Sequence, residues 1–175
     1  VTGGRKQQFD FSEPILVTRQ VLVQRLPKNW LQMRTRDEIE KGLIRSSLEL
    51  AGKTIHVQEG SIFVKRLQTL SDEIGDTIFI VEDPRDVEDL VAAVANRDIA
   101  LTIADEHMAN VFLRNYRNID IKTPVSFDQK IAWALRKESG NELLKEVNNW
   151  LSEFLPDREG RLLYDKYFNP AIKNR

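Results

Sequence analysis

Residues 54–112 repeat one pattern three times: a short apolar run, a polar turn, and a stretch whose apolar residues recur at helical spacing. The apolar runs cover residues 54–58, 77–81 and 99–104. Strands that alternate with helices at this spacing favour right-handed βαβ crossovers and a parallel sheet. The last two runs are almost continuously apolar, as in strands covered on both faces. The pattern therefore predicts an α/β fold.

The helices of this repeat have recognisable starts. Asp83 is placed to cap the second helix, with Pro84 in its first turn, and Ser61 is placed to cap the first. The apolar stripe of the second helix consists of Val87, Leu90, Val91 and Val94. Stripes of this kind predict helices that face a core and do not indicate a cofactor site.

Further elements flank the repeat. Strands are predicted over residues 15–24, 118–123 and 130–136, and a helix near residues 36–44 within a polar connector. A longer C-terminal helix ends at Pro156, and the tail after it is predicted to form another short helix. The apolar face of the longer helix consists of Leu143, Leu144, Val147, Trp150, Leu151 and Phe154.

Composition excludes several functions. The 26 Lys and Arg residues nearly balance 27 Asp and Glu residues, so we expect no nucleic-acid partner. The absence of cysteine excludes disulfides and thiol catalysis. His56 and His107 belong to no cluster with ligand spacing, and no phosphate-binding loop or nucleophile elbow is found, so we expect no metal and no cofactor. No apolar run is long enough to span a bilayer, and no signal peptide is recognised.

Candidate binding residues lie where the predicted strands end. Ligands bind outside the carboxyl ends of strands in open α/β sheets, and the turns there contain Gly60, Ser61 and Asp105. The N–H groups that open a helix favour an anion, and a carboxylate favours a cation. The plainer interpretations are that Gly60 and Ser61 only turn the chain, and that Asp105 only caps a helix, which is worth about 1 kcal/mol. The sequence leaves both interpretations open.

The order of several segments resembles a known family. Thr2-Gly-Gly-Arg5, followed by residues 9–14, is similar to the end of lobe one in family 3 solute-binding proteins, the bilobed periplasmic receptors for amino acids and related ligands. Residues 51–61 are similar to the entry into lobe two, residues 99–105 to its third strand, and residues 129–137 to the return strand. The resemblance implies a periplasmic-binding-protein-like (type II) lobe with a parallel-rich sheet and flanking helices, plus hinge strands and a remnant of the other lobe.

The resemblance also implies how the chain is divided. We expect the end of lobe one and a hinge strand in residues 1–25, a connector in 26–52, lobe two in 53–126, the return hinge strand and terminal helix in 127–156, and a linker towards a following domain in 157–175.

One branch of the family is similar in two further places. The connector over residues 29–50 and the ending Leu163-Tyr-Asp-Lys-Tyr-Phe168 resemble membrane-bound lytic murein transglycosylases of type F. In that branch the receptor-like module precedes a lysozyme-like catalytic domain. The resemblance implies a non-catalytic module in the periplasm that has a downstream catalytic domain as its partner. Contact with peptidoglycan and association with the outer membrane would come through the parent protein.

In this family an amino-acid-like ligand is held by its charged ends. Arg5 falls on the arginine that forks onto the ligand carboxylate, a two-bond contact that lysine cannot reproduce. Asp105 falls on the acidic residue that pairs with the ligand ammonium. Gly60 and Ser61 would offer N–H groups to the same anion, and Thr2 would offer a hydroxyl nearby. The resemblance thus implies an amino-acid-like or muropeptide-like ligand.

Binding would be coupled to closure of lobe two onto lobe one, with residues 17–24 and 129–136 as hinge strands. Two alternatives stay open: a receptor of an amino-acid ABC transporter, and a degenerate lobe that binds nothing. The chain departs from the family pattern at Gly4, where an acidic residue is common, and at Ile15, where an aromatic residue is common. Arg5 has a plainer interpretation as a solvated surface arginine.

No catalytic residue is expected in this chain. Lysozyme-like lytic transglycosylases use one glutamate, typically in a Glu-Ser motif, as general acid and base. Glu138 and Ser139 match these two letters, but they stand at a helix start, where a glutamate suits the helix dipole.

Overall fold

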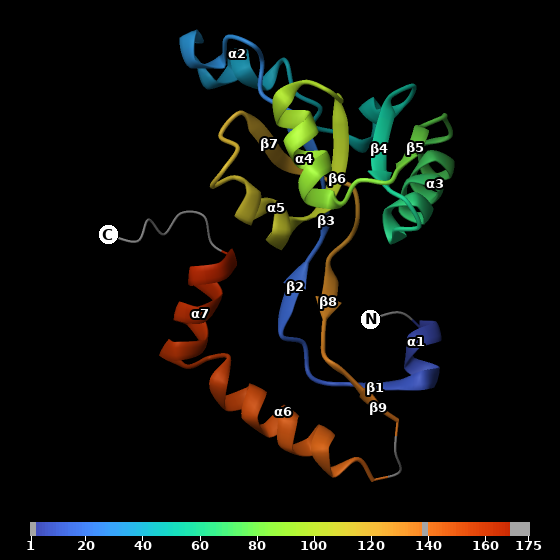
Figure 1. Cartoon of the computed structure of the whole chain (residues 1–175), viewed down its shortest axis with the longest axis vertical. Coiled ribbons are helices and arrows are strands. Elements are labelled where there is room, and N and C mark those ends of the chain that lie inside the picture. Colours follow the sequence, from blue (N-terminus) through green and yellow to red (C-terminus); the bar gives the residue numbers. More distant parts are fainter. Residues whose placement is uncertain (1–2, 138–139, 169–175) are drawn as a thin grey trace. The chain divides into compact units, whose positions relative to one another are not determined.

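The computed structural model describes residues 3–137 and 140–168 of the chain. The chain divides into two compact units (Figure 1). The larger unit comprises Arg19–Phe127, and the smaller unit comprises Val1–Thr18 and Asp128–Arg175.

The larger unit is built around a five-stranded sheet. Its strands are β3 (Gln20–Arg25), β4 (Thr54–Gln58), β5 (Phe79–Asp83), β6 (Leu101–Asp105) and β7 (Ile119–Pro124). The strand order is β5-β4-β6-β3-β7; β4 is parallel to β5 and β6, whereas β3 is antiparallel to β6 and β7. The predicted α/β class with a parallel-rich sheet is confirmed, and the sheet is mixed because β3 runs against its neighbours.

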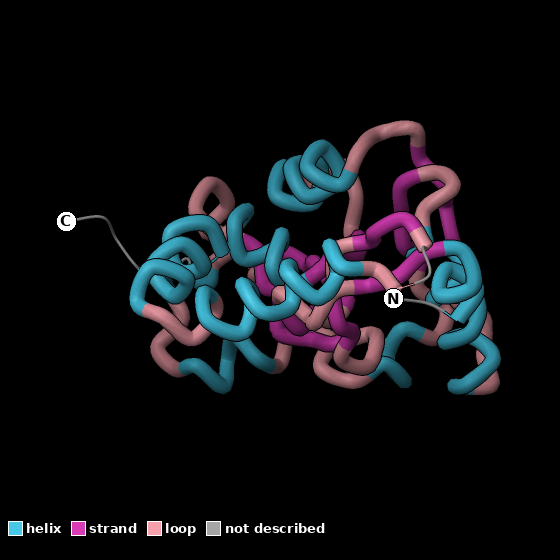
Figure 2. The backbone as a smooth tube through the Cα atoms, turned by 90° about the horizontal axis from the view of Figure 1, so that it is seen from below, coloured by secondary structure: helices cyan, strands magenta, loops and turns pink. Residues whose placement is uncertain are grey.

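Helices cover both faces of this sheet. α4 (Val87–Asn96) and α5 (Glu106–Phe112) pack in one core cluster with Val21 of β3, while α3 (Ile62–Ile74) packs in a second cluster with Leu22. Consecutive residues of a strand point to opposite faces, so the two clusters lie on opposite sides of the sheet. Figure 1 shows α4 lying along β3 and β6, and Figure 2 shows helices flanking the strands.

The connector before β4 is held by a partly buried ion pair. It contains two short 3-10 turns, η1 (Trp30–Gln32) and η2 (Ser47–Leu50), and the five-residue helix α2 (Arg36–Glu40), which is shorter than the helix predicted there. Arg45 donates two hydrogen bonds to the carboxylate of Asp120 in β7, from Nη1 to Oδ1 at 2.5 Å and from Nη2 to Oδ2 at 3.0 Å. This hydrogen-bonded pairing raises the pKa of Arg45 above its usual value, and it ties the connector to the sheet.

The smaller unit contains two short antiparallel strand pairs and three helices. β1 (Phe9–Phe11) pairs with β9 (Ala134–Arg136), and β2 (Leu16–Thr18) pairs with β8 (Gln129–Ile131). The helices are α1 (Gly3–Gln8), α6 (Glu142–Phe154) and α7 (Arg158–Phe168). α6 and α7 confirm the two C-terminal helices that the sequence predicted.

Aromatic stacking joins the residue before β9 to α6. Trp150 of α6 stacks on Trp133, with ring centroids 6.1 Å apart, and on Phe154, with centroids 4.5 Å apart. Leu151 is the one hydrophobic residue of the smaller unit that is buried, among the residues that the structure describes there. This unit therefore relies on stacked surface side chains more than on a core.

Several predicted boundaries were wrong. The run over residues 15–24 forms two strands, β2 and β3, in different units, because the chain changes its partner at Arg19, whose carbonyl accepts the Glu106 N–H at 2.8 Å. The run over residues 130–136 is likewise split into β8 and β9. Two of the repeat strands, β5 and β6, begin two residues later than predicted.

The predicted cap of α4 was also wrong. Asp83 ends β5, where its carboxylate accepts hydrogen bonds from Arg85 Nε at 2.9 Å and Nη2 at 2.7 Å. Asp86 caps the helix instead, because its carboxylate accepts the N–H of Asp89 at 2.9 Å. Arg85 therefore keeps Asp83 in the strand, and the helix begins only at Val87.

Candidate ligand-binding site

The candidate site of the larger unit lies where two neighbouring parallel strands end. β4 and β6 are paired, and they end at Gln58 and Asp105, respectively. Gly60 and Ser61 follow β4 directly and lead into α3. Three of the predicted site residues therefore lie at the same edge of the sheet, as the alternating pattern predicted.

The turn after β4 uses its own N–H groups internally. Gly60 has φ +67°, a left-handed conformation that favours glycine, and its N–H donates to Glu82 Oε2 at 3.0 Å. The N–H of Ser61 donates to the carbonyl of Gln58 at 3.1 Å. The structure thus differs from the expectation that both N–H groups face a ligand anion, because a carboxylate and a carbonyl of the same unit already engage them.

The hydroxyl of Ser61 has a different environment. Ser61 occupies the N-cap position of α3 with an extended backbone, but its side chain makes no capping hydrogen bond. Its Oγ atom is buried and has no hydrogen-bond partner among the described residues. A buried polar atom without a partner costs free energy, so such an atom marks a place where a ligand or water completes the structure.

Asp105 does not act as a helix cap. It occupies the N-cap position of α5, yet its side chain makes no capping hydrogen bond, which removes the interpretation that it only caps the helix. The side chain is half-buried, and burial raises its pKa above the usual value, while the nearby His107 acts in the opposite direction. Desolvation makes the ionised carboxylate less stable, so a cation placed against it would be strongly attracted.

Sequence reasoning missed a third side chain at this edge. Gln20 begins β3 and lies directly opposite Asp105 in the antiparallel register. Its side chain is 1% exposed, and its Oε1 atom has no hydrogen-bond partner among the described residues. The one signal in the sequence is a glutamine at the start of the apolar run that continues through Val23.

Gln20 and Asp105 lie on the α3 side of the sheet. Residues directly opposite one another in an antiparallel pair share a face, with Cβ atoms about 5 Å apart. The next pair on that face, Leu22 and Ile103, belongs to the core cluster that contains α3 residues. The N-terminus of α3, with Ser61, therefore stands at the same edge and on the same side as this pair.

The charges around Asp105 leave the edge negative. Arg19 Nη2 and Glu106 Oε1 form an ion pair at 2.9 Å, so these two charges offset each other. Burial lowers the pKa of the half-buried His107, which favours its neutral form. The carboxylates of Asp105 and of Glu82, which accepts the Gly60 N–H, add negative charge at this edge, and the edge consequently suits a cationic group.

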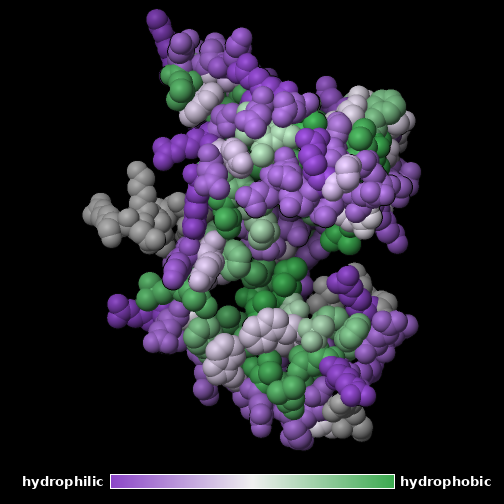
Figure 3. All heavy atoms as spheres, viewed as in Figure 1, coloured by the Kyte–Doolittle hydropathy of each residue, from purple (hydrophilic) through white to green (hydrophobic). Residues whose placement is uncertain are grey.

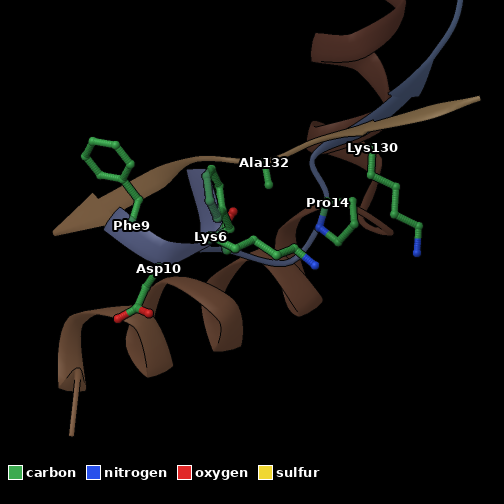
Figure 4. A pocket seen from close by; sticks show the side chains of 8 residues that line it. Lys6, Phe9, Asp10, Pro14, Lys130 and Ala132 are labelled. Carbon is green, nitrogen blue, oxygen red and sulfur yellow. The ribbon is translucent and has the colours of Figure 1, made fainter. Parts of the chain in front are cut away.

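A separate hollow lies in the smaller unit. It has a volume of about 380 Å³, and Lys6, Phe11, Pro14 and Lys130 are among its lining residues. Figure 4 shows Lys6 reaching towards Pro14, with Lys130 on the other side of Pro14. Asp10 lines this hollow together with the two lysines, so its charges are mixed, and Arg5 does not line it, although Arg5 precedes Lys6 in α1.

The remaining predicted site residues belong to the smaller unit or lie outside the description. Arg5 is an exposed residue of α1. Thr2 lies outside the described residues, as do Glu138 and Ser139, for which no site role is predicted. Within residues 3–137 and 140–168, no group of three His, Asp or Glu side chains is placed to hold a metal ion, and no helix is both long and apolar enough to cross a membrane.

Comparison with known proteins shows the family. The model of the bacterial extracellular solute-binding proteins, family 3, matches residues 1–170. The chain belongs to this family.

Two curated relatives of this family 3 protein are whole proteins of different kinds. Membrane-bound lytic murein transglycosylase F of Desulfosudis oleivorans is 31% identical over 167 residues, which cover 95% of this chain and 34% of the relative. The arginine-binding extracellular protein ArtP of Bacillus subtilis is 29% identical over 172 residues, which cover 95% of this chain and 59% of the relative. The chain thus spans about a third of the transglycosylase.

Solved structures agree with the family 3 fold. An ancestral arginine-binding protein bound to arginine superimposes with a TM-score of 0.68 at 24% identity, covering 96% of this chain and 68% of that protein. At this identity the match bears on the fold alone.

Proposed function

We propose that this chain is the ligand-binding, regulatory module of a cell-envelope murein lytic transglycosylase, and that it works by lobe closure on an amino-acid-like or muropeptide-like ligand. The observation that carries the proposal is the half-buried Asp105 carboxylate, which is desolvated and makes no capping bond at the edge of the sheet. A half-buried carboxylate that does not cap its helix, at the edge where strands end, is typical of a residue that binds a ligand.

The proposal assigns complementary tasks to the predicted residues. Asp105 accepts the ligand ammonium, and Ser61 adds its unpartnered hydroxyl beside it. Arg5 takes the ligand carboxylate, with Thr2 as a neighbouring hydroxyl contact and Gly60 as the residue that shapes the turn. A ligand shifts the equilibrium towards closure only by as much as it binds the closed form more tightly.

The parent protein is proposed from the family relatives. Similarity to a membrane-bound lytic murein transglycosylase over nearly the whole chain supports a catalytic domain as the partner. The same relatives support a periplasmic location, with outer-membrane association and contact with peptidoglycan through the parent protein. In this arrangement the module reports on the ligand, and the cleavage chemistry belongs to the partner domain.

The runner-up is a receptor of an amino-acid ABC transporter, which the similarity to an arginine-binding extracellular protein favours. The two candidates differ in what the ligand changes. In the transglycosylase module, a bound ligand alters the rate at which the intact natural protein cleaves peptidoglycan. In a transport receptor there is no cleavage to alter. A degenerate lobe, the third candidate, binds no ligand in either setting.

The test uses the natural protein with two matched aspartate variants. Calorimetric titration with L-arginine, L-glutamate and a muropeptide with a free amine identifies the ligand that binds. Asp105→Asn should then raise the Kd at least about tenfold, because a charge-assisted hydrogen bond is lost. Asp98→Asn, an exposed residue after α4, is the control and should leave the Kd unchanged. Equal affinities in both variants, or no binding of any probe to the natural protein, would contradict the proposal.

A further inference from the structure

A buried glutamine at the same edge has no structural explanation. Gln20 is 1% exposed, and its Oε1 atom lacks a hydrogen-bond partner among the described residues. Its backbone is fully engaged, because its N–H donates to Ser126 Oγ at 2.8 Å and its carbonyl accepts the Val125 N–H at 2.9 Å. The backbone therefore holds the residue in place while the buried amide oxygen stays unsatisfied.

A second glutamine of β3 shows what a structural amide looks like in this sheet. Gln24 is 4% exposed and points to the same face, four residues further along the strand. Its Nε2 donates to the carbonyl of Ile44 at 2.9 Å, and its Oε1 accepts the N–H of Ile44 at the same distance. Two buried glutamines on one strand thus differ in one respect: Gln24 is satisfied within the fold, and Gln20 is not.

The position of Gln20 connects it with Asp105. The two residues are directly opposite in the β3–β6 register, so their side chains share one face with Cβ atoms about 5 Å apart. The Ser61 hydroxyl, also buried without a partner, belongs to the helix start on this side. Three oxygen acceptors therefore gather at one edge, and one of them is charged.

We propose that Gln20 is a specificity-determining ligand contact, and that its amide oxygen accepts a hydrogen bond from the same cationic group of the ligand that Asp105 pairs with. The inference rests on the proposed ligand-binding function and adds a residue to its site. An ammonium group carries three donors, so one carboxylate cannot satisfy it alone. The neutral Gln20 oxygen provides a second acceptor without placing another negative charge beside a desolvated carboxylate.

This arrangement favours ligands with a free amine over acylated ones. An N-acetylated amine loses its charge and keeps one N–H donor, so it can pair with Gln20 or Asp105 but leaves the other acceptor unpaired under the bound ligand. The N-acetylated form of a ligand that binds should therefore lose more affinity in the natural protein than in a variant without the acceptor.

The test compares two substitutions of equal shape change on the same strand. Gln20→Met removes the unsatisfied oxygen at nearly constant length, so the ligand-free protein should melt at the same temperature or higher, while the Kd for the amine ligand rises about tenfold. Gln24→Met breaks satisfied bonds to Ile44, so it should lower the melting temperature and leave the Kd unchanged. Thermal unfolding without ligand gives the melting temperature, and calorimetry gives the Kd for the amine-bearing probe that binds the natural protein.

The outcomes separate this inference from the proposed function. If Asp105→Asn abolishes binding and Gln20→Met leaves the Kd unchanged, the inference is wrong and the proposed function stands. If Gln20→Met lowers the melting temperature as Gln24→Met does, without changing the Kd, the amide is structural and the inference is equally overturned. If no amine-bearing probe binds the natural protein, the proposed function fails first and the inference fails with it.

Discussion

The larger and the smaller unit of this chain bury their apolar side chains to very different extents. In the larger unit, two clusters lie on opposite faces of a five-stranded sheet; one contains Leu22 and Ile103 and the other contains Leu90, all at 0% exposure. Of the buried hydrophobic residues in the described part of the chain, Leu151 alone belongs to the smaller unit. On the face seen in Figure 3, apolar side chains gather over the smaller unit, while the larger unit is mostly hydrophilic.

The apolar side chains of the smaller unit line a groove and do not fill a core. The groove has a volume of about 250 Å³, and Trp133, Trp150, Leu163 and Tyr164 are among its lining residues, all about half exposed. Isolated two-stranded pairs are marginally stable in water, and this unit has only such pairs among its described strands. The larger unit therefore contains most of the buried apolar surface, and the proposed ligand-binding edge lies in this unit.

The largest expected effect tests the partly buried ion pair of the larger unit. Arg45→Met leaves the Asp120 carboxylate, whose side chain is 5% exposed, without its cationic partner and with only the longer hydrogen bonds from Gln24 and the Lys122 N–H, so it should cost about 3–5 kcal/mol of unfolding free energy. Arg36→Met is the control, because Arg36 is 77% exposed and lies 3.9 Å from Glu40, so its loss should cost less than about 1 kcal/mol. Urea unfolding measures both. Equal costs would show that the connector is not anchored through Asp120.

The next effect compares a core leucine with a groove leucine. Leu22→Ala opens a cavity in the larger unit and should cost about 2–5 kcal/mol. Leu163→Ala removes a side chain that is 50% exposed and should cost less than about 1 kcal/mol. Backbone amides of β3 and β6 should exchange hydrogen faster in Leu22→Ala than in the natural protein. A cost for Leu163→Ala as high as that for Leu22→Ala would mean that the smaller unit has a core after all.

The smallest expected effects concern the pH dependence of stability, in which two aspartates of the larger unit should differ. Hydrogen bonds from Arg85 hold the pKa of Asp83 well below its usual value, whereas burial raises the pKa of Asp105. Asp83 therefore adds stability above its unfolded pKa of about 3.9, and this stability is lost as the pH falls through the lower folded value. For Asp105 the sign is opposite, since stability is fully present below about pH 3.9 and is lost as the pH rises through the higher folded value.

The two variants should accordingly change the pH dependence in opposite directions. Asp83→Asn should be less stable than the natural protein at neutral pH and approach it in acid. Asp105→Asn should be as stable or more stable at neutral pH, and the difference should vanish in acid. Urea unfolding between pH 3 and pH 7 measures both, with Asp98→Asn as the reference. A loss of stability in Asp105→Asn at neutral pH would point to a structural task for this carboxylate.

Local pattern was sufficient for much of the fold and for part of the site. The alternation of apolar runs with helical stripes predicted β4, α3, β5, α4 and β6 in order, and the rule for parallel sheets predicted that Ser61 and Asp105 share an edge. The prediction of a single strand over residues 15–24 was wrong, because the apolar pattern does not show that the chain changes its pairing partner at Arg19. The predicted cap at Asp83 failed because the competing Arg85 guanidinium lies in the same turn.

The sequence pattern identified most of the helices and strands, because periodicity, turn residues and charge act over a few neighbouring positions. Which distant residues meet depends on the tertiary fold. It pairs Gln20 with Asp105 across β3 and β6, and Arg45 with Asp120 across the connector and β7. It also leaves one buried glutamine of β3 satisfied and the other not. Such facts depend on strand register and chain reversal, where a shift of one residue turns every side chain to the other face.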